Sequence, residues 1–265
     1  MFFAMAADFP GNTEAAPVGV FDSGVGGLTV LEALRRALPG RDFIYFGDTA
    51  RVPYGSKPPE LVRRFAWEIS GFLLRRGAGA IVVACNTASS LALGDLRRLG
   101  VPVFDVIGPA VLEAADYHHV GVIGTRATVA SRAYQQRLEA AGKRVWALAT
   151  PLFVPIVEEG LWNDAVAELV ARHYLEAAPH DLEALILGCT HYPYLKPLLA
   201  RLRPQLKLID SAAPTAARVA AALGPKAGSG SVVHYVSGDP DAYRALAQRL
   251  GVRVDQVRKV ELGEL

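Results

Sequence analysis

The chain has 265 residues, of which 51% are hydrophobic and 20% charged, and its formal net charge at pH 7 is +2. This composition supports one large domain or two of ordinary size with a substantial core, and it excludes wholesale disorder. The near balance of charges gives no reason to expect a nucleic acid partner. No apolar run reaches the roughly 18–20 residues that span a bilayer, so we predict a cytoplasmic protein without a membrane partner.

The opening residues 1–17 lack a basic n-region and carry two acidic residues, Asp8 and Glu14. Because a secretory signal begins with basic residues, we interpret this segment as a leader before the first strand. The two cysteines of such a chain, Cys85 and Cys189, are more typical of free thiols than of a disulfide.

Short β-branched runs alternate with helical patterns along the rest of the chain. A first series of strands is predicted at 18–22, 43–47, 80–85 and 102–106, and a second series at 120–124, 145–149, 184–188 and 206–210. Helical periodicity occurs at 26–38, 59–76, 126–141 and 163–178. The tail adds a strand at 232–236 and a helix from Asp239 to Gly251. Continuous apolar strands interleaved with helices indicate parallel sheets covered on both faces, which is an α/β fold.

The two series of strands correspond to each other with an offset of roughly 102–105 residues. The matched positions are Val18-Gly19-Val20 with Val120-Gly121-Val122, Val52-Pro53 with Val154-Pro155, Cys85 with Cys189, and Asp105 and Pro109 with Asp210 and Pro214. We therefore predict two similar parallel-sheet α/β domains related by pseudo-twofold symmetry, with the active site in the cleft between them. The alternative is that parallel α/β units share such spacings without being repeats.

Distinctive polar residues follow the carboxyl ends of the strands, where open parallel sheets bind their ligands. These residues are Asp22 and Ser23, Tyr54 and Gly55, Cys85 with Asn86 and Thr87, and Cys189 with Thr190 and His191. In "DSGVGG", Thr29 stands where a dinucleotide fingerprint needs its third glycine, so that motif is excluded. The glycines predict either an anion-binding helix N-terminus or only a tight turn.

No metal site is expected, because Cys189, His191, His118 and His119 match no closed set of zinc ligands. A single buried cysteine is commonly apolar filler. Two cysteines at matching ends of matching repeats instead favour chemistry.

Inverting a carbon centre that bears an acidic hydrogen needs a base on one face and an acid on the other, with the roles exchanged in reverse. Two like thiols, each with an unperturbed pKa of about 8.5, meet this need if each has one helpful neighbour. Asp22 and His191 are the candidate neighbours. The candidates for holding the substrate's carboxylates are Asn86, Thr87 and Thr190.

The stretches "FDSGVGGLTVL", "GDTARVPYG", "ACNTAS", "PLFVPIVEEG" and "GCTHYPYL" resemble the signature stretches of glutamate racemase, in the aspartate/glutamate racemase superfamily. The resemblance runs from about residue 18 to 238. It implies that Cys85 and Cys189 are the acid/base pair of an isomerase that interconverts L- and D-glutamate without pyridoxal or another cofactor. It also implies substrate contacts from Asp22, Ser23, Tyr54, Gly55, Asn86, Thr87, Thr190 and His191. A glutamate of "VPIVEEG" belongs to the family's site, and we favour Glu158 over Glu159.

The resemblance further implies a first domain of residues 18–108 plus 212–265 and a second domain of residues 109–211. It implies a homodimer that makes D-glutamate for peptidoglycan, and hence a part in cell wall biogenesis and cell shape.

Other functions stay open at this point. A racemase of aspartate, or a one-thiol decarboxylase or isomerase, is the nearest alternative, although the presence of both thiols argues against one-thiol chemistry. A two-lobed protein that only binds an acidic amino acid, or a redox or regulatory protein, would also explain part of the pattern.

Overall fold

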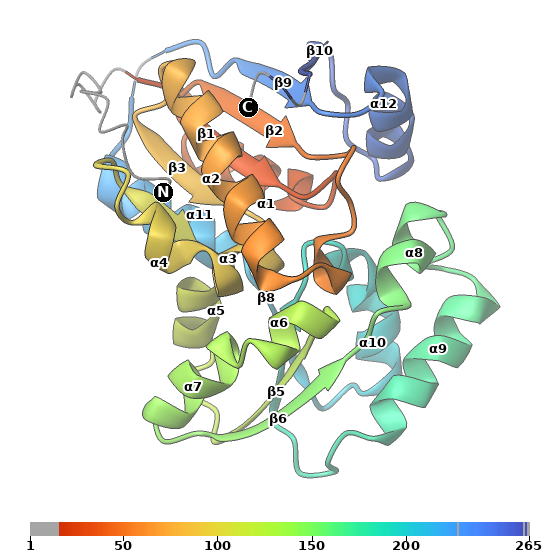
Figure 1. Cartoon of the computed structure of the whole chain (residues 1–265). Coiled ribbons are helices and arrows are strands. Elements are labelled where there is room, and N and C mark those ends of the chain that lie inside the picture. The colour runs from red at the N-terminus through yellow and green to blue at the C-terminus, as the bar shows by residue number, and fades with distance from the viewer. Residues whose placement is uncertain (1–15, 227, 262, 264–265) are drawn as a thin grey trace.

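The computed structural model describes residues 16–226, 228–261 and 263, and the strands in these residues form two parallel sheets. Figure 1 shows the sheets in separate halves of the molecule, each with its own helices. The sequence-based leader falls mostly on residues 1–15, which lie outside the described residues. No helix in the described part of the chain is both long and apolar enough to span a bilayer.

The first domain is built on six strands in the order β10-β9-β2-β1-β3-β4. They are β1 (Val18–Asp22), β2 (Phe43–Gly47), β3 (Ala80–Val83), β4 (Val103–Asp105), β9 (Val232–Val236) and β10 (Val257–Lys259). The helices α1 (Leu28–Ala37), α2 (Pro59–Arg75), α3 (Asn86–Leu91), α4 (Leu93–Leu96) and α12 (Pro240–Arg249) accompany this sheet. Its central strands are buried along their whole length, as a parallel sheet with helices on both faces requires.

The second domain is built on four strands in the order β6-β5-β7-β8. They are β5 (His119–Gly124), β6 (Arg144–Ala149), β7 (Ala184–Gly188) and β8 (Lys207–Asp210). The helices in this part of the chain are α5 (Ile107–Glu113), α6 (Arg126–Ala130), α7 (Ala133–Ala140), α8 (Phe153–Glu158), α9 (Ala165–Glu176) and α10 (Lys196–Leu202). The next helix, α11 (Ala212–Leu223), packs against α1.

The two domains repeat one topology. The order β2-β1-β3-β4 in the first sheet is the order β6-β5-β7-β8 in the second, and β9 and β10 extend the first sheet beyond β2. The prediction of two similar parallel-sheet α/β domains is therefore confirmed. The domain boundaries of 18–108 plus 212–265 and of 109–211 stay a prediction.

A glycine at the same place in each central strand explains the repeated Val-Gly-Val. A Cβ on Gly19 would lie 3.0 Å from the Cδ1 of Ile81, and a Cβ on Gly121 would lie 2.7 Å from the Cδ2 of Leu182. In both domains a glycine thus lets neighbouring core side chains approach the central strand closely.

Three predicted elements have different bounds in the structure. The single helix predicted at 126–141 is divided into α6 and α7, because Arg132 adopts a left-handed conformation with φ of 57°. The strand predicted at 80–85 ends at Val83, because Cys85 instead caps the N-terminus of α3. The helix predicted at 26–38 begins only at Leu28, after the turn that surrounds Asp22.

Candidate active site

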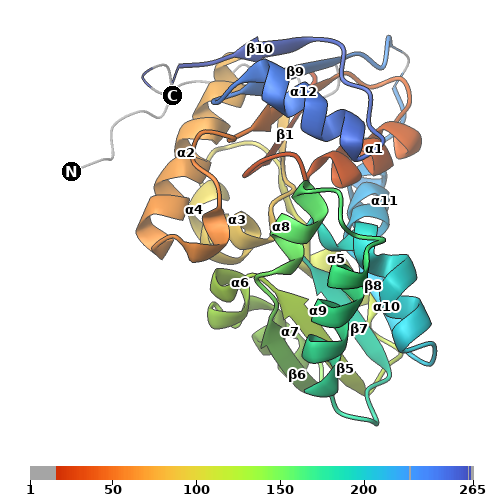
Figure 2. The same cartoon turned by 90° about the vertical axis from the view of Figure 1, so that its right-hand side faces the viewer.

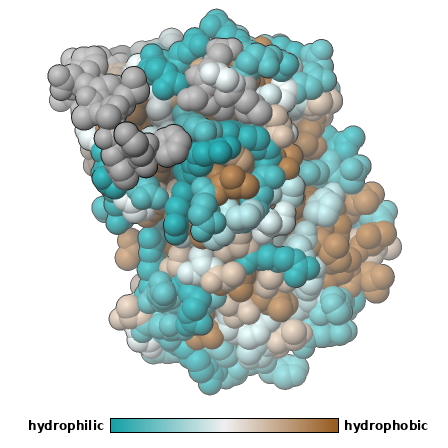
Figure 3. Space-filling view, viewed as in Figure 1, coloured by the Kyte–Doolittle hydropathy of each residue, from teal (hydrophilic) through white to brown (hydrophobic). Residues whose placement is uncertain are grey.

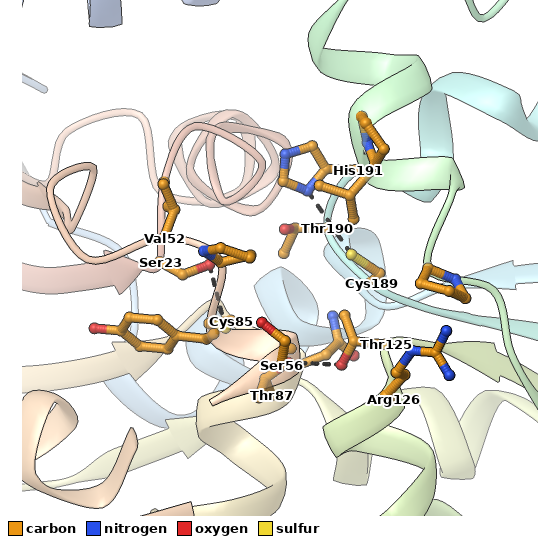
Figure 4. A pocket seen from close by; sticks show the side chains of 18 of the residues that line it. Ser23, Val52, Ser56, Cys85, Thr87, Thr125, Arg126, Cys189, Thr190 and His191 are labelled. Carbon is orange, nitrogen blue, oxygen red and sulfur yellow. Dashed lines mark hydrogen bonds between the residues drawn. The ribbon is translucent and has the colours of Figure 1, made fainter. Parts of the chain in front are cut away.

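A pocket of about 370 Å³ lies between the two domains, beyond the carboxyl ends of their strands. Its lining includes Ser23, Tyr54, Gly55, Cys85, Asn86, Thr87, Glu158, Cys189, Thr190 and His191 from the predicted site. Both thiols line it, one from each domain, and Figure 4 shows Cys85 near Ser23 on one side and Cys189 near His191 on the other. The place of the pocket agrees with the rule that open parallel sheets bind ligands at this edge.

Cys85 is buried at the edge of an apolar cluster of the first domain and makes two hydrogen bonds there. Its Sγ accepts a hydrogen bond from the amide of Ala88 at 3.5 Å and donates one to the Oγ of Ser23 at 3.7 Å. Burial and then the nearby charge of Asp22 raise the pKa of Cys85 to about 12, although the amide of Ala88 and the hydroxyl of Ser23, which donate to the sulfur once it is ionised, oppose the rise. Cys85 is therefore a neutral thiol at neutral pH in the free protein.

Cys189 lies in a different environment, beside an imidazole. The Sγ of Cys189 is 3.7 Å from the Nδ1 of His191, and the Nε2 of His191 is 3.1 Å from the Oε1 of Glu158. Burial lowers the pKa of His191, but its hydrogen bonds with Cys189 and Glu158 outweigh burial and raise that pKa to about 10. His191 therefore carries a proton at neutral pH, held between a sulfur and a carboxylate.

The two neighbouring glutamates point to different places. Glu158 contacts His191, and its side chain is 35% exposed, whereas the side chain of Glu159 is 73% exposed and lies 3.8 Å from Arg249. The structure thus brings Glu158, and not Glu159, against the site.

Asp22 is fully buried and does not line the pocket itself. Its Oδ2 accepts hydrogen bonds from the amides of Gly24 and Gly27 at 3.0 and 3.1 Å, while its Oδ1 has no hydrogen-bond partner among the described residues. Burial raises the pKa of Asp22 above its usual value. The charge of His191 and the hydrogen bonds from the glycine amides oppose this rise only in part. The two amides of "DSGVGG" are thus occupied by the chain's own carboxylate, which favours the tight-turn interpretation of that loop.

Hydrogen bonds between hydroxyl and amide side chains join the two domains at the base of the pocket. The Oγ1 atoms of Thr87, Thr125 and Thr128 are mutually within 2.9–3.2 Å. Asn86 accepts a hydrogen bond from the hydroxyl of Tyr134 at 2.6 Å, and its Nδ2 is buried with no protein partner in the described residues. A buried donor of this kind is a candidate for binding a ligand carboxylate.

The loop that carries Tyr54 and Gly55 closes another side of the pocket. The hydroxyl of Tyr54 donates to the buried carboxylate of Asp48, which also accepts from Ser237 at 2.7 Å, so this phenol is bound away from a ligand. A Cβ on Gly55 would lie 2.8 Å from the Cγ2 of Thr125, so glycine allows the loop to approach the second domain. Thr190 is linked to the first domain at a separate point, because its backbone carbonyl accepts a hydrogen bond of 3.3 Å from the hydroxyl of Thr29 in α1.

Sequence reasoning missed several lining residues, among them Ser56, Thr125, Arg126 and Pro151. The internal repeat contained a signal for Thr125, because Thr125 is the counterpart of Ser23. No comparable signal marks Arg126. Within the part of the chain that the structure describes, no cluster of three or more His, Cys, Asp or Glu residues is arranged to hold a metal ion.

Comparison with known proteins agrees with this geometry. A family model described as Asp/Glu/Hydantoin racemase matches residues 18–219. A glutamate racemase of Thermus thermophilus is 63% identical over 256 residues, which cover 94% of this chain and 98% of that protein.

Two solved structures show the likeness in three dimensions. Glutamate racemase from Thermus thermophilus in complex with beta-chloro-D-alanine superposes with a TM-score of 0.92 at 62% identity, covering 96% of this chain and all of that chain (100%). Glutamate racemase from Francisella tularensis in complex with D-glutamate superposes with a TM-score of 0.90 at 35% identity, covering 95% and 100%. The chain therefore belongs to the Asp/Glu/Hydantoin racemase family and, within it, to the glutamate racemases.

Proposed function

We propose that this chain interconverts L- and D-glutamate by a cofactor-independent, two-base mechanism in which Cys85 and Cys189 exchange protons with the α-carbon. The observation that carries the proposal is that the two thiols, one from each domain, line one pocket and have different neighbours. Support for glutamate as substrate comes from the relative that is 63% identical and carries the name glutamate racemase.

In the direction that begins at Cys189, its thiolate removes the α-hydrogen from one face of glutamate. His191 holds the proton that the thiol gives up, and Glu158 orients the imidazole. The Cys85 thiol, neutral at rest, then donates its proton to the opposite face. In the reverse direction Cys85 acts as base with the help of Asp22, and Cys189 acts as acid.

The charge that develops on the substrate's carboxylate is held by groups on the floor of the site. The Nδ2 of Asn86 is buried and available, and the hydroxyls of Thr87 and Thr125 form a preorganised cluster beside it. Fixed donors of this kind stabilise a charged transition state without having to reorganise. We assign the substrate contacts to Ser23, Asn86, Thr87, Thr190 and His191, with Tyr54 and Gly55 shaping the wall.

By the same family resemblance we propose that the chain works as a cytoplasmic homodimer. Its D-glutamate would supply peptidoglycan synthesis, and so cell wall biogenesis and cell shape.

The proposed activity is tested by incubating the protein in heavy water with L-glutamate and, separately, with L-aspartate. We expect the optical rotation of L-glutamate to fall to zero while deuterium replaces its α-hydrogen, and we expect aspartate to keep its rotation. Loss of rotation by aspartate alone would make the substrate assignment wrong. Binding of glutamate without any deuterium exchange would instead identify a binding protein.

A further inference from the structure

An arginine of the first domain forms a hydrogen bond with the segment of the second domain that carries Glu158. The Nη1 of Arg249, the last residue of α12, donates a hydrogen bond of 2.7 Å to the backbone carbonyl of Glu158, the last residue of α8. The same nitrogen lies 3.8 Å from the carboxylate of Glu159. Figures 1 and 2 both show one end of α12 close to α8, across the boundary between the domains.

The local chemistry suits this contact. The last carbonyls of a helix have no partner within that helix, and a cation is favoured there by the helix dipole. Gly160 follows in the left-handed region with φ of 77°, and a Cβ on it would lie 3.0 Å from the Cδ of Arg249. The chain after α8 therefore leaves room for the arginine side chain to lie against it.

The two helices are each anchored in their own domain. In α12, Tyr243 and Ala247 are buried, and in α8, Phe153, Ile156 and Val157 are buried. Arg249 itself is half-exposed, so its contact with Glu158 links two elements that are already packed. Its loss should shift the end of α8 slightly and leave both helices folded.

A direct line of contacts leads from this link to a thiol. The Oε1 of Glu158 is 3.1 Å from the Nε2 of His191, and the Nδ1 of His191 is 3.7 Å from the Sγ of Cys189. We propose that Arg249 is a positioning residue. Its hydrogen bond from α12 to the end of α8, which we call the latch, holds Glu158 against His191. The latch thereby keeps the Cys189 side of the site in its working geometry. The inference rests on the proposed racemization, and it gives the C-terminal helix a part in it.

The matched variants are R249A, R249K and R244A. Arg244 lies on the same helix, has a similarly exposed side chain and forms an ion pair with Asp241 of its own helix, so it controls for loss of a surface cation on α12. We expect R249A to lower kcat for glutamate by about 10-fold, since a misplacement of about 1 Å can cost about 10²-fold. R249K, which keeps a donor, should recover most of the rate, and R244A should match the unchanged protein.

Deuterium exchange measured separately for each enantiomer distinguishes loss of the latch from a general loss of structure. Deuterium exchange should fall in R249A mainly for the enantiomer whose exchange is lost in C189S, because only that half of the site is displaced. Equal loss for both enantiomers, or equal rates in R249A and R244A, would overturn the proposal.

Amide hydrogen exchange gives a readout that does not depend on activity. Exchange over residues 153–160 should become faster in R249A than in R244A, with the core strands unchanged. Unchanged exchange over this segment would overturn the latch even if the protein racemizes glutamate. Faster exchange in a protein that does not racemize glutamate would refute the proposed function and leave the latch standing.

Discussion

Replacing either cysteine by serine is expected to lower racemization of glutamate by at least about 10³-fold. General acid–base catalysis typically contributes about 10²–10⁴-fold, and a serine hydroxyl is far harder to ionise than a thiol. Each variant should still exchange the α-hydrogen of one enantiomer with deuterium, because one working thiol remains on one face. C85S and C189S should retain opposite enantiomers, as followed by proton NMR of D- and L-glutamate in heavy water.

The control for these variants is their stability. Both sulfurs are buried, and a serine oxygen is close to sulfur in size, so we expect both variants to fold. Their melting temperatures check this. Two folded variants that both racemize at the unchanged rate would refute the two-thiol mechanism. Two variants that both keep exchange with the same enantiomer would show that the thiols act from one face.

The second large effect is expected from D22N and H191N, which remove the two titratable neighbours of the thiols. Racemization should fall by about 10²–10⁴-fold in each. Because the equilibrium constant of racemization is one, kcat/KM must fall equally in both directions. Exchange without inversion is free of this constraint, so D22N should weaken exchange from the enantiomer that Cys85 deprotonates and H191N from the other.

D22N is a sharp test because asparagine keeps an oxygen for the amides of Gly24 and Gly27 while it removes the charge. Its fold should therefore survive, which a thermal melt would check. H191N likewise keeps a polar side chain beside Cys189. If both variants impair the same enantiomer, the assignment of one helper to each thiol is wrong.

Much of the fold followed from local pattern. Continuous apolar strands such as 18–22 and 184–188 could be placed to the residue, because both of their faces are buried and turn residues follow them. The repeat then predicted that Cys85 and Cys189 end equivalent strands, and equivalent strand ends in facing domains converge on one pocket. Two domains, one pocket and the thiols in it could therefore be predicted.

Contacts between residues far apart in the chain could not be predicted from the sequence. Nothing in the local pattern links Tyr134 to Asn86, or Arg249 to the end of α8. The break at Arg132 was also invisible, because helical periodicity continues on both sides of a single left-handed residue.

The two domains differ in the titratable groups that accompany their thiols. By the offset of the repeat, Asp22 has Gly124 as its counterpart, and His191 has Thr87. Each domain thus supplies one titratable helper, but from non-equivalent positions: a carboxylate behind Cys85 and an imidazole beside Cys189. A repeat analysis alone predicts like thiols in like surroundings. The residues at the strand ends had already pointed to Asp22 and His191 as unlike neighbours, and the structure adds the contact between His191 and Cys189.

The geometry of a bound substrate is the most direct test of this mechanism. A crystal structure with D- or L-glutamate should show the sulfurs of Cys85 and Cys189 on opposite faces of the α-carbon, with a carboxylate near the Nδ2 of Asn86. Both sulfurs on one face, or a ligand held away from either sulfur, would contradict proton transfer between two opposed thiols.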